Sequence, residues 1–132
     1  MRHVLLAVVL TLLAALPLRA QDTIEGVIRS QIEAFQRDDF ATAFTFASPV
    51  IQGMFGNPDN FGAMVRQGYP MVHRPAEVTF DAQVERGGRT YQRVILRDAQ
   101  GAYHAAEYEM VRNQSGWKIN GVQVLKLPDV GA

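Results

Sequence analysis

Three short stretches in the second half of the chain each place a glycine just before the sequence returns to an apolar run. They are residues 85–89 (ERGGR), 98–102 (DAQGA) and 113–117 (NQSGW). This spacing fits a type I turn closed by a left-handed glycine, a common connection between antiparallel strands. Three such turns predict four strands in a meander. Because the first half of the chain has helical patterns, the sequence predicts an α+β fold with helices covering one face of the sheet.

The first twenty residues have the layout of a secretory signal peptide. A short basic start, Arg2-His3, precedes an apolar run of about thirteen residues that Pro17 breaks, and Ala20 offers a small residue for cleavage. A membrane anchor is the alternative, but a bilayer needs about twenty apolar residues. We therefore expect a periplasmic or secreted protein with no membrane anchor after cleavage. Residues 21–132 then form a single domain.

Composition narrows the classes of partner. No cysteine occurs in the chain, which excludes disulfides, thiolate metal sites and a lipid anchor on an N-terminal cysteine. The formal net charge is +0, from 13 basic and 13 acidic residues; losing Arg2 and Arg19 leaves 11 basic against 13 acidic residues, a charge of −2. A near-neutral chain without a basic cluster predicts no nucleic-acid partner. His73 and His104 lie too far apart in sequence for metal-ligand spacing, so no metal site is expected.

The first half is expected to hold three helices. Thr23 is a suitable N-cap, and the apolar residues that follow repeat at helical spacing with polar side chains on the opposite side. A second, short helix restarts at Asp38 or Asp39, and Ser48-Pro49 should stop it. A third helix is expected within residues 57–70, between an Asn-Pro start and a Tyr-Pro end.

The register of the sheet follows from counting if the first two turns hold three residues each. The predicted pairs are Glu85 with Arg89, Val78 with Leu96, Phe80 with Val94, Ala82 with Gln92, Asp98 with Ala102, Val94 with Ala106 and Leu96 with His104. Val84 and Tyr108 then share an apolar inner face, while Arg93 lies opposite Glu107 on the outer face. Gly121 predicts a bulge in the last strand, whose register stays open because its turn could hold three or four residues.

Three polar side chains on the otherwise apolar inner face are the candidate site residues. Gln92 and Tyr108 are cross-strand neighbours, and His104 lies four residues from Tyr108, about 13 Å away along the strand. These groups could line a cavity as hydrogen-bonding partners, with His104 able to change protonation near neutral pH. The alternative is that Tyr108 packs in the core and His104 caps the sheet edge. The inner positions that can be assigned carry no carboxylate.

A resemblance to a known superfamily covers nearly all the mature chain. It rests on the order of elements, on the helix junction AFQRDDF (residues 34–40) and on the strand start GWKI (residues 116–119). The chain resembles the ketosteroid-isomerase-like superfamily, also called nuclear-transport-factor-two-like or SnoaL-like. The resemblance implies a curved, cone-like sheet, a cavity between helices and sheet, and frequent dimers through the outer sheet face. Residues 55–75 also look like a small exported bacterial family known as a domain of unknown function. The isomerases of the superfamily use a carboxylate base, which the inner face lacks.

These observations favour a non-catalytic exported module that encloses a small apolar or amphipathic ligand between helices and sheet. The expected lining is Phe44, Phe61, Met64, Tyr69, Gln92, His104, Tyr108 and Trp117. One alternative is an isomerase- or dehydratase-like enzyme with His104 as base and Tyr108 polarising a carbonyl. Another is a structural or protein-interaction domain. No cofactor is expected, and the charge balance of the outer sheet face allows a homodimer through that face.

Overall fold

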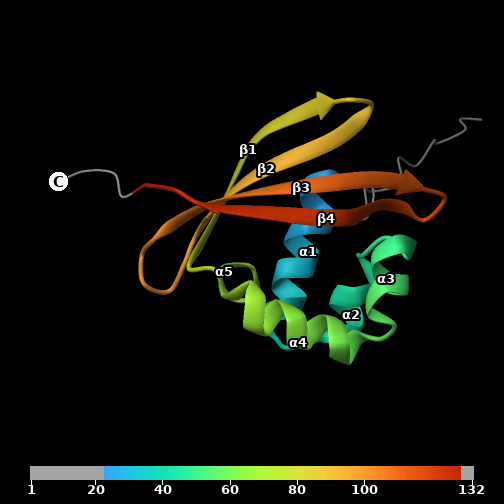
Figure 1. The fold of residues 1–132 in the computed structure, drawn as a ribbon, viewed down its shortest axis with the longest axis horizontal. Helices are drawn as coiled ribbons and strands as arrows, with labels where there is room; N and C mark the ends of the chain where they lie inside the picture. The colour runs from blue at the N-terminus through green and yellow to red at the C-terminus, as the bar shows by residue number, and fades with distance from the viewer. Residues whose placement is uncertain (1–22, 129–132) are drawn as a thin grey trace, which may run out of the picture.

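The computed structural model describes residues 23–128, so the predicted signal peptide lies outside the described part of the chain. Within these residues, five helices precede four strands (Figure 1). The elements are α1 (Ile24–Gln36), α2 (Phe40–Thr45), α3 (Pro49–Phe55), α4 (Pro58–Gly68), α5 (Pro70–His73), β1 (Glu77–Arg86), β2 (Arg89–Arg97), β3 (Tyr103–Asn113) and β4 (Gly116–Lys126). No described helix is long and apolar enough to cross a membrane.

The strands form one antiparallel sheet in the order β1-β2-β3-β4, and the helices lie together on one side of it (Figure 1). The α+β prediction is therefore confirmed. On the inner face, Val94, Leu96 and Ala106 are fully buried in the same cluster as Val27 and Ile28 of α1. Removing this apolar surface from water, at about 25 cal/mol per Å², is the main force that holds the helices on the sheet.

Side-chain caps start the three helices that the sequence predicts. The Thr23 hydroxyl accepts a hydrogen bond from the Gly26 amide at 3.0 Å, which caps α1. Asp39 caps α2 by accepting from the Thr42 amide at 3.1 Å. Asn57 caps α4 in the same way. Each cap satisfies an amide that would otherwise lack a partner in the first helical turn, so the predicted starts are confirmed.

The second helix, α2, ends at Thr45 just before Ser48-Pro49, as predicted, but these two residues also begin α3, a helix that the sequence analysis did not predict. The Ser48 hydroxyl accepts from the Ile51 amide at 3.2 Å, and proline occupies the first turn, where it loses no hydrogen bond. The same hydroxyl donates to Asn120 Oδ1 at 2.7 Å. The Ser48 amide also donates to the Ile119 carbonyl at 2.8 Å. The junction between α2 and α3 is thereby fastened to β4.

The three-residue loop predicted for the first hairpin is also wrong. Arg86 pairs with Arg89, which leaves Gly87 and Gly88 as a two-residue turn. Their φ angles of 57° and 75° fit a type I′ turn, which needs positive φ at both central positions. The predicted pair Glu85–Arg89 is therefore absent, because Glu85 pairs with Thr90.

A bulge in β1 reconciles this shorter turn with the rest of the predicted register. Phe80 pairs with Val94 as predicted, but the next pair is Gln83 with Gln92, not Ala82 with Gln92. The extra residue reverses the facing of the strand beyond it. Val84, predicted to face inward, is consequently 40% exposed.

The other two hairpins agree better with the sequence. Each β2–β3 pair follows the predicted register, including Leu96 with His104, and the Asp98 amide donates to the Ala102 carbonyl at 2.8 Å across a three-residue loop. The last turn is shorter than the three or four residues expected, because Asn113 pairs with Gly116. The predicted bulge at Gly121 is confirmed. Gly121 pairs with Glu109, and the next pair is Ile119 with Met110, so the register shifts between these two pairs.

The outer sheet face carries ion pairs that run diagonally across the strands. Arg93 lies opposite Glu107 as predicted, but the carboxylate of Glu107 pairs with Arg86 instead. Arg89 pairs with Glu109 at 2.9 Å. Exposed pairs of this kind contribute only about 0–1 kcal/mol each. A homodimer through this face stays a prediction.

Candidate functional site: an apolar cavity between the helices and the sheet

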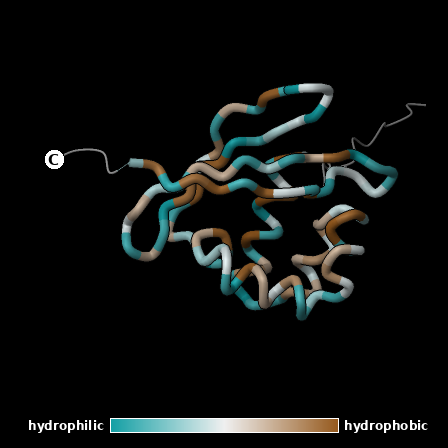
Figure 2. Tube along the Cα trace, viewed as in Figure 1, coloured by the Kyte–Doolittle hydropathy of each residue, from teal (hydrophilic) through white to brown (hydrophobic). Residues whose placement is uncertain are grey.

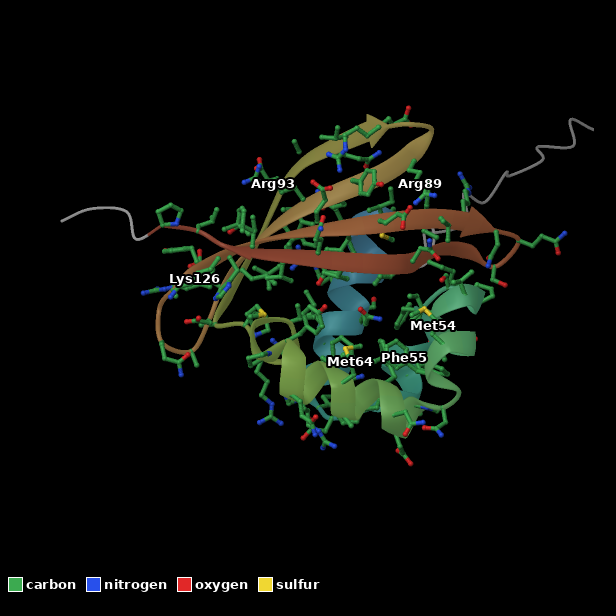
Figure 3. The ribbon with its side chains drawn as sticks, in the orientation of Figure 1. Met54, Phe55, Met64, Arg89, Arg93 and Lys126 are labelled. Carbon is green, nitrogen blue, oxygen red and sulfur yellow. The ribbon has the colours of Figure 1, made fainter. Side chains whose placement is uncertain are left out.

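A cavity of about 320 Å³ lies between the helical layer and β4. Met54, Phe55 and Met64 point from α3 and α4 into the space beneath the sheet (Figure 3). The lining from α1, α3 and α4 consists of Gln31, Phe35, Ile51, Met54, Phe55, Phe61, Met64 and Val65. Met54 also remains 70% exposed, so the cavity reaches the surface beside α3.

The remaining wall comes from α5 and the residue before it, from β4 and from the turn before α3. It is formed by Ala47, Tyr69, Val72, Ile119, Gly121 and Val122. The bulge in β4 lies in this wall, since Glu109 pairs with Gly121 and Met110 with Ile119. Asn120, the extra residue, accepts from Ser48, so the bulge holds the start of α3 at the cavity edge.

The ring of Phe61 organises the aromatic side of the cavity. Its centroid lies 5.7 Å from that of Phe35 in α1, 5.4 Å from Phe44 in α2 and 5.6 Å from Phe55 in α3. Tilted and edge-on pairs at these distances are the favourable geometries for aromatic rings. One side chain of α4 therefore sets the spacing of three other helices around the cavity.

No charged side chain lines the cavity as the structure describes it. The chain has no charged residue between Asp39 and Asp59, the segment that includes α2 and α3, and hydrophobic colouring is visible on α3 in Figure 2. Gln31 is the buried polar member of the lining, 2% exposed, and its Nε2 donates to the Ala43 carbonyl at 3.2 Å. Such a lining suits an apolar molecule and disfavours a charged one.

The residues that the sequence predicts as lining divide into two groups. Phe61, Met64 and Tyr69 line the cavity. The other five lie outside the lining: Phe44, Gln92, His104, Tyr108 and Trp117. The ring of Phe44 packs against that of the lining residue Phe61. The side-chain amide of Gln92 is 2% exposed and donates to the carbonyls of Asp81 and Arg93, so it is used inside the sheet.

His104 and Tyr108 do not form a shared site with the cavity. His104 is 6% exposed, and its Nε2 lies 2.8 Å from Asp98 Oδ2 at the hairpin between β2 and β3. Tyr108 is fully buried, and burial raises the pKa of its hydroxyl. Among the described residues, that hydroxyl has no hydrogen-bond partner. A tyrosine buried in this way stays protonated over the ordinary pH range.

Sequence reasoning missed the part of the lining that α3 supplies, because that helix was not predicted. It also missed Gln31, for which a signal was present. Gln31 follows Val27 and Ile28 and precedes Phe35 at helical spacing, so it is a polar residue on the apolar stripe of α1.

Replacing Tyr108 with phenylalanine is expected to leave the protein as stable or to stabilise it by up to about 1 kcal/mol. The change removes a buried hydroxyl that has no partner among the described residues and keeps the packed ring. Urea unfolding followed by circular dichroism measures the difference. A decrease of 1 kcal/mol or more in the free energy of unfolding would contradict the expectation, since it would mean that the hydroxyl makes a stabilising hydrogen bond.

Two aspartate–histidine contacts hold the edges of the helical layer and of the sheet. Asp38, which has a φ of 54°, accepts from His73 Nε2 at 2.6 Å and from Arg74 at 2.8 Å. The contact ties the end of α5, next to the lining residue Val72, to the junction of α1 and α2. The second contact is the one between Asp98 and His104 described above.

These contacts predict a loss of stability in acid. The hydrogen bond from His73 and the charge of Arg74 lower the pKa of Asp38, and the hydrogen bond from His104 lowers the pKa of Asp98. A carboxyl group with a lowered folded-state pKa contributes stability above its unfolded pKa of about 3.9. That contribution disappears as the pH falls through the folded value.

Thermal unfolding from pH 6 to pH 2 tests the acid sensitivity. The midpoint should fall with pH in the wild type, and its fall should be smaller in Asp98→Asn. Glu33→Gln is the matched control, because Glu33 is exposed and has no ion pair among the described residues. Equal pH slopes in the wild type and Asp98→Asn would contradict the assignment.

Comparison with known proteins identifies a solved structure with a similar fold and the family of the chain. A SEC-C motif containing protein from Rhodopseudomonas palustris has a similar solution structure, with a TM-score of 0.58, 18% sequence identity and 80% coverage of each chain. At that identity the similarity concerns the fold alone. No curated protein matches the chain significantly. The model of a family described as a domain of unknown function (DUF4864) matches residues 18–132, nearly the whole chain, and the protein belongs to that family.

Proposed function

We propose that this protein is a non-catalytic, exported module that binds a small apolar or amphipathic molecule in the cavity beneath β4. The observation that carries the proposal is the cavity of about 320 Å³, which no charged side chain of residues 23–128 lines. Ligand sites in proteins are typically concave, apolar and of about 300–1,000 Å³. The surface opening beside Met54 gives a route of entry.

Two further observations support binding over catalysis. His104 and Tyr108, the pair that an isomerase-like mechanism would use, are absent from the lining. The His104 ring is engaged with Asp98, and Tyr108 lies fully buried in the sheet. A general base must reach the proton that it removes, directly or through one water molecule.

Membership of the ketosteroid-isomerase-like superfamily is part of the same proposal. It is supported by the one-sided helical layer on a twisted antiparallel meander and by the cavity between the two layers (Figure 1). Export is supported by the sequence of residues 1–20. The intact mass of the protein isolated from its native cell tests export, because cleavage after Ala20 gives a chain that begins at Gln21.

Native mass spectrometry of the protein purified without denaturant tests ligand binding. The expected result is an added mass that disappears on denaturation. Met64→Trp, which places a larger side chain in the lining, should lose the added mass. Met71→Trp is the matched control, because Met71 is also partly buried against the core but lies outside the lining. An apo mass for the wild type, or retention of the added mass in Met64→Trp, would count against the proposal.

A further inference from the structure

The buried amide of Gln31 has unused hydrogen-bonding capacity in the cavity wall. A primary amide offers two N–H donors and an oxygen that accepts two hydrogen bonds. The contact of Nε2 with the Ala43 carbonyl fixes the orientation of the amide, since the opposite orientation would place two oxygens against each other. Among the described residues no hydrogen bond reaches Gln31 Oε1. Within residues 23–128, the oxygen is thus an acceptor without a partner on a residue of the lining.

The rest of the lining restricts the charge of a ligand. Apart from Gln31 and the half-buried ring of Tyr69, the side chains of the lining are apolar, and none can neutralise an ionised group. Burying a carboxylate or an ammonium group without a counter-charge is costly. A neutral molecule binds without this cost in free energy. A hydrogen-bond donor on the ligand would also satisfy Oε1.

We infer that the cavity selects a neutral, largely apolar molecule whose hydrogen-bond donor, such as a hydroxyl group, binds Gln31 Oε1. The inference rests on the proposed function, because it names the ligand class of the same cavity. The volume is consistent with a molecule of two fused rings, since about 320 Å³ is roughly twice the cavity of about 150 Å³ that accepts benzene. Gln31 is then the residue that distinguishes an alcohol from a hydrocarbon of the same shape.

Three probes with one ring system test this inference: naphthalene, 2-naphthol, which is neutral at pH 7, and 2-naphthalenesulfonate, which is an anion. Their dissociation constants are measured for the wild type by fluorescence titration. The ratio of the naphthalene constant to the 2-naphthol constant should fall about 5- to 10-fold in Gln31→Met, the effect of one lost hydrogen bond. The sulfonate should bind most weakly.

Gln92→Met is the matched control. Gln92 is 2% exposed, like Gln31, and its amide is also hydrogen-bonded, but it lies outside the lining. Both variants lose a buried amide, yet only Gln31→Met should change the probe ratio. An unchanged ratio in Gln31→Met, or tight binding of the sulfonate, would overturn the inference and leave the proposed function in place. Failure of all the probes to bind the wild type would count against both.

A second readout does not depend on the folding of a variant. In the wild type, the side-chain amide resonances of Gln31 should shift on addition of 2-naphthol, and they should shift less with naphthalene. The amide resonances of Gln92 should stay in place with either probe. Bound 2-naphthol that leaves the Gln31 amide unmoved would overturn the inference.

Discussion

Replacing Phe61 with alanine is expected to lower the free energy of unfolding by about 3 to 5 kcal/mol, the usual cost of deleting a buried aromatic ring. Phe61 is 5% exposed, and its ring meets those of Phe35, Phe44 and Phe55. The space left behind would enlarge a cavity that already exists, so the neighbouring rings can recover little of the lost contact. Urea unfolding followed by circular dichroism measures the loss.

Two further variants keep this prediction testable. A small domain is stable by about 5–15 kcal/mol, so Phe61→Leu, which removes less volume, provides a measurement if the alanine variant does not fold. Phe80→Ala is the control. Phe80 is only partly buried, lies under Arg29, and has no aromatic ring against it among the described residues. A loss in Phe61→Ala no larger than that in Phe80→Ala would show that Phe61 does not organise the helical layer.

Replacing Gly62 with alanine is expected to destabilise the protein by about 1 to 3 kcal/mol, the range for overpacking a close contact. A Cβ at this position would lie 2.5 Å from Cγ of Phe40. The Phe40 ring has little freedom to move away, because Phe35 and His73 flank it and Arg66 lies over it. Gly62 therefore permits α4 to approach α2 closely.

The same substitution at Gly53 should have the opposite sign. Gly53 lies inside α3, and apart from its two chain neighbours and the backbone of its own helix, no atom of the described residues lies within 4 Å of a Cβ built there. Alanine should stabilise that helix by about 0.5 to 1 kcal/mol, because glycine loses more backbone entropy on folding. Thermal or urea unfolding of the two variants compares one chemical change in two environments. Equal effects would mean that helix propensity, and not the contact with Phe40, decides both.

Local chemistry explains which parts of the fold could be predicted. The caps Thr23, Asp39 and Asn57 accept hydrogen bonds from amides three residues further along the chain, so the sequence alone locates the starts of α1, α2 and α4. The turn at Asp98 is equally local, and it correctly aligns β2 with β3. Side-chain alternation then assigns each residue of those two strands to a face.

Sequence reasoning missed the start of α3 and gave the wrong length for the first hairpin turn, because in both places one sequence pattern is compatible with two local structures. Ser48-Pro49 follows the end of one helix, as predicted, and also caps the next, where the Ser48 hydroxyl accepts from the Ile51 amide. The Ser48 amide in addition donates to the carbonyl of Ile119, far along the chain. Gly87 and Gly88 fit either a three-residue or a two-residue turn. A bulge near Ala82 compensates for the shorter turn, and pairing with Val94 keeps the rest of the register as predicted.

The sequence by itself determined the fold class, the starts of α1, α2 and α4 and the faces of the central strands, because each depends on contacts over a few residues or on strict alternation. Only the tertiary structure decided the site. The cavity wall joins Gln31, α3 and the bulge after Ile119, which are far apart in the chain, and its volume is what remains after their packing. The sequence left open whether His104 and Tyr108 line that volume or pack away from it, and it did not reveal the spare acceptor on Gln31, since both depend on which side chains meet across the layers.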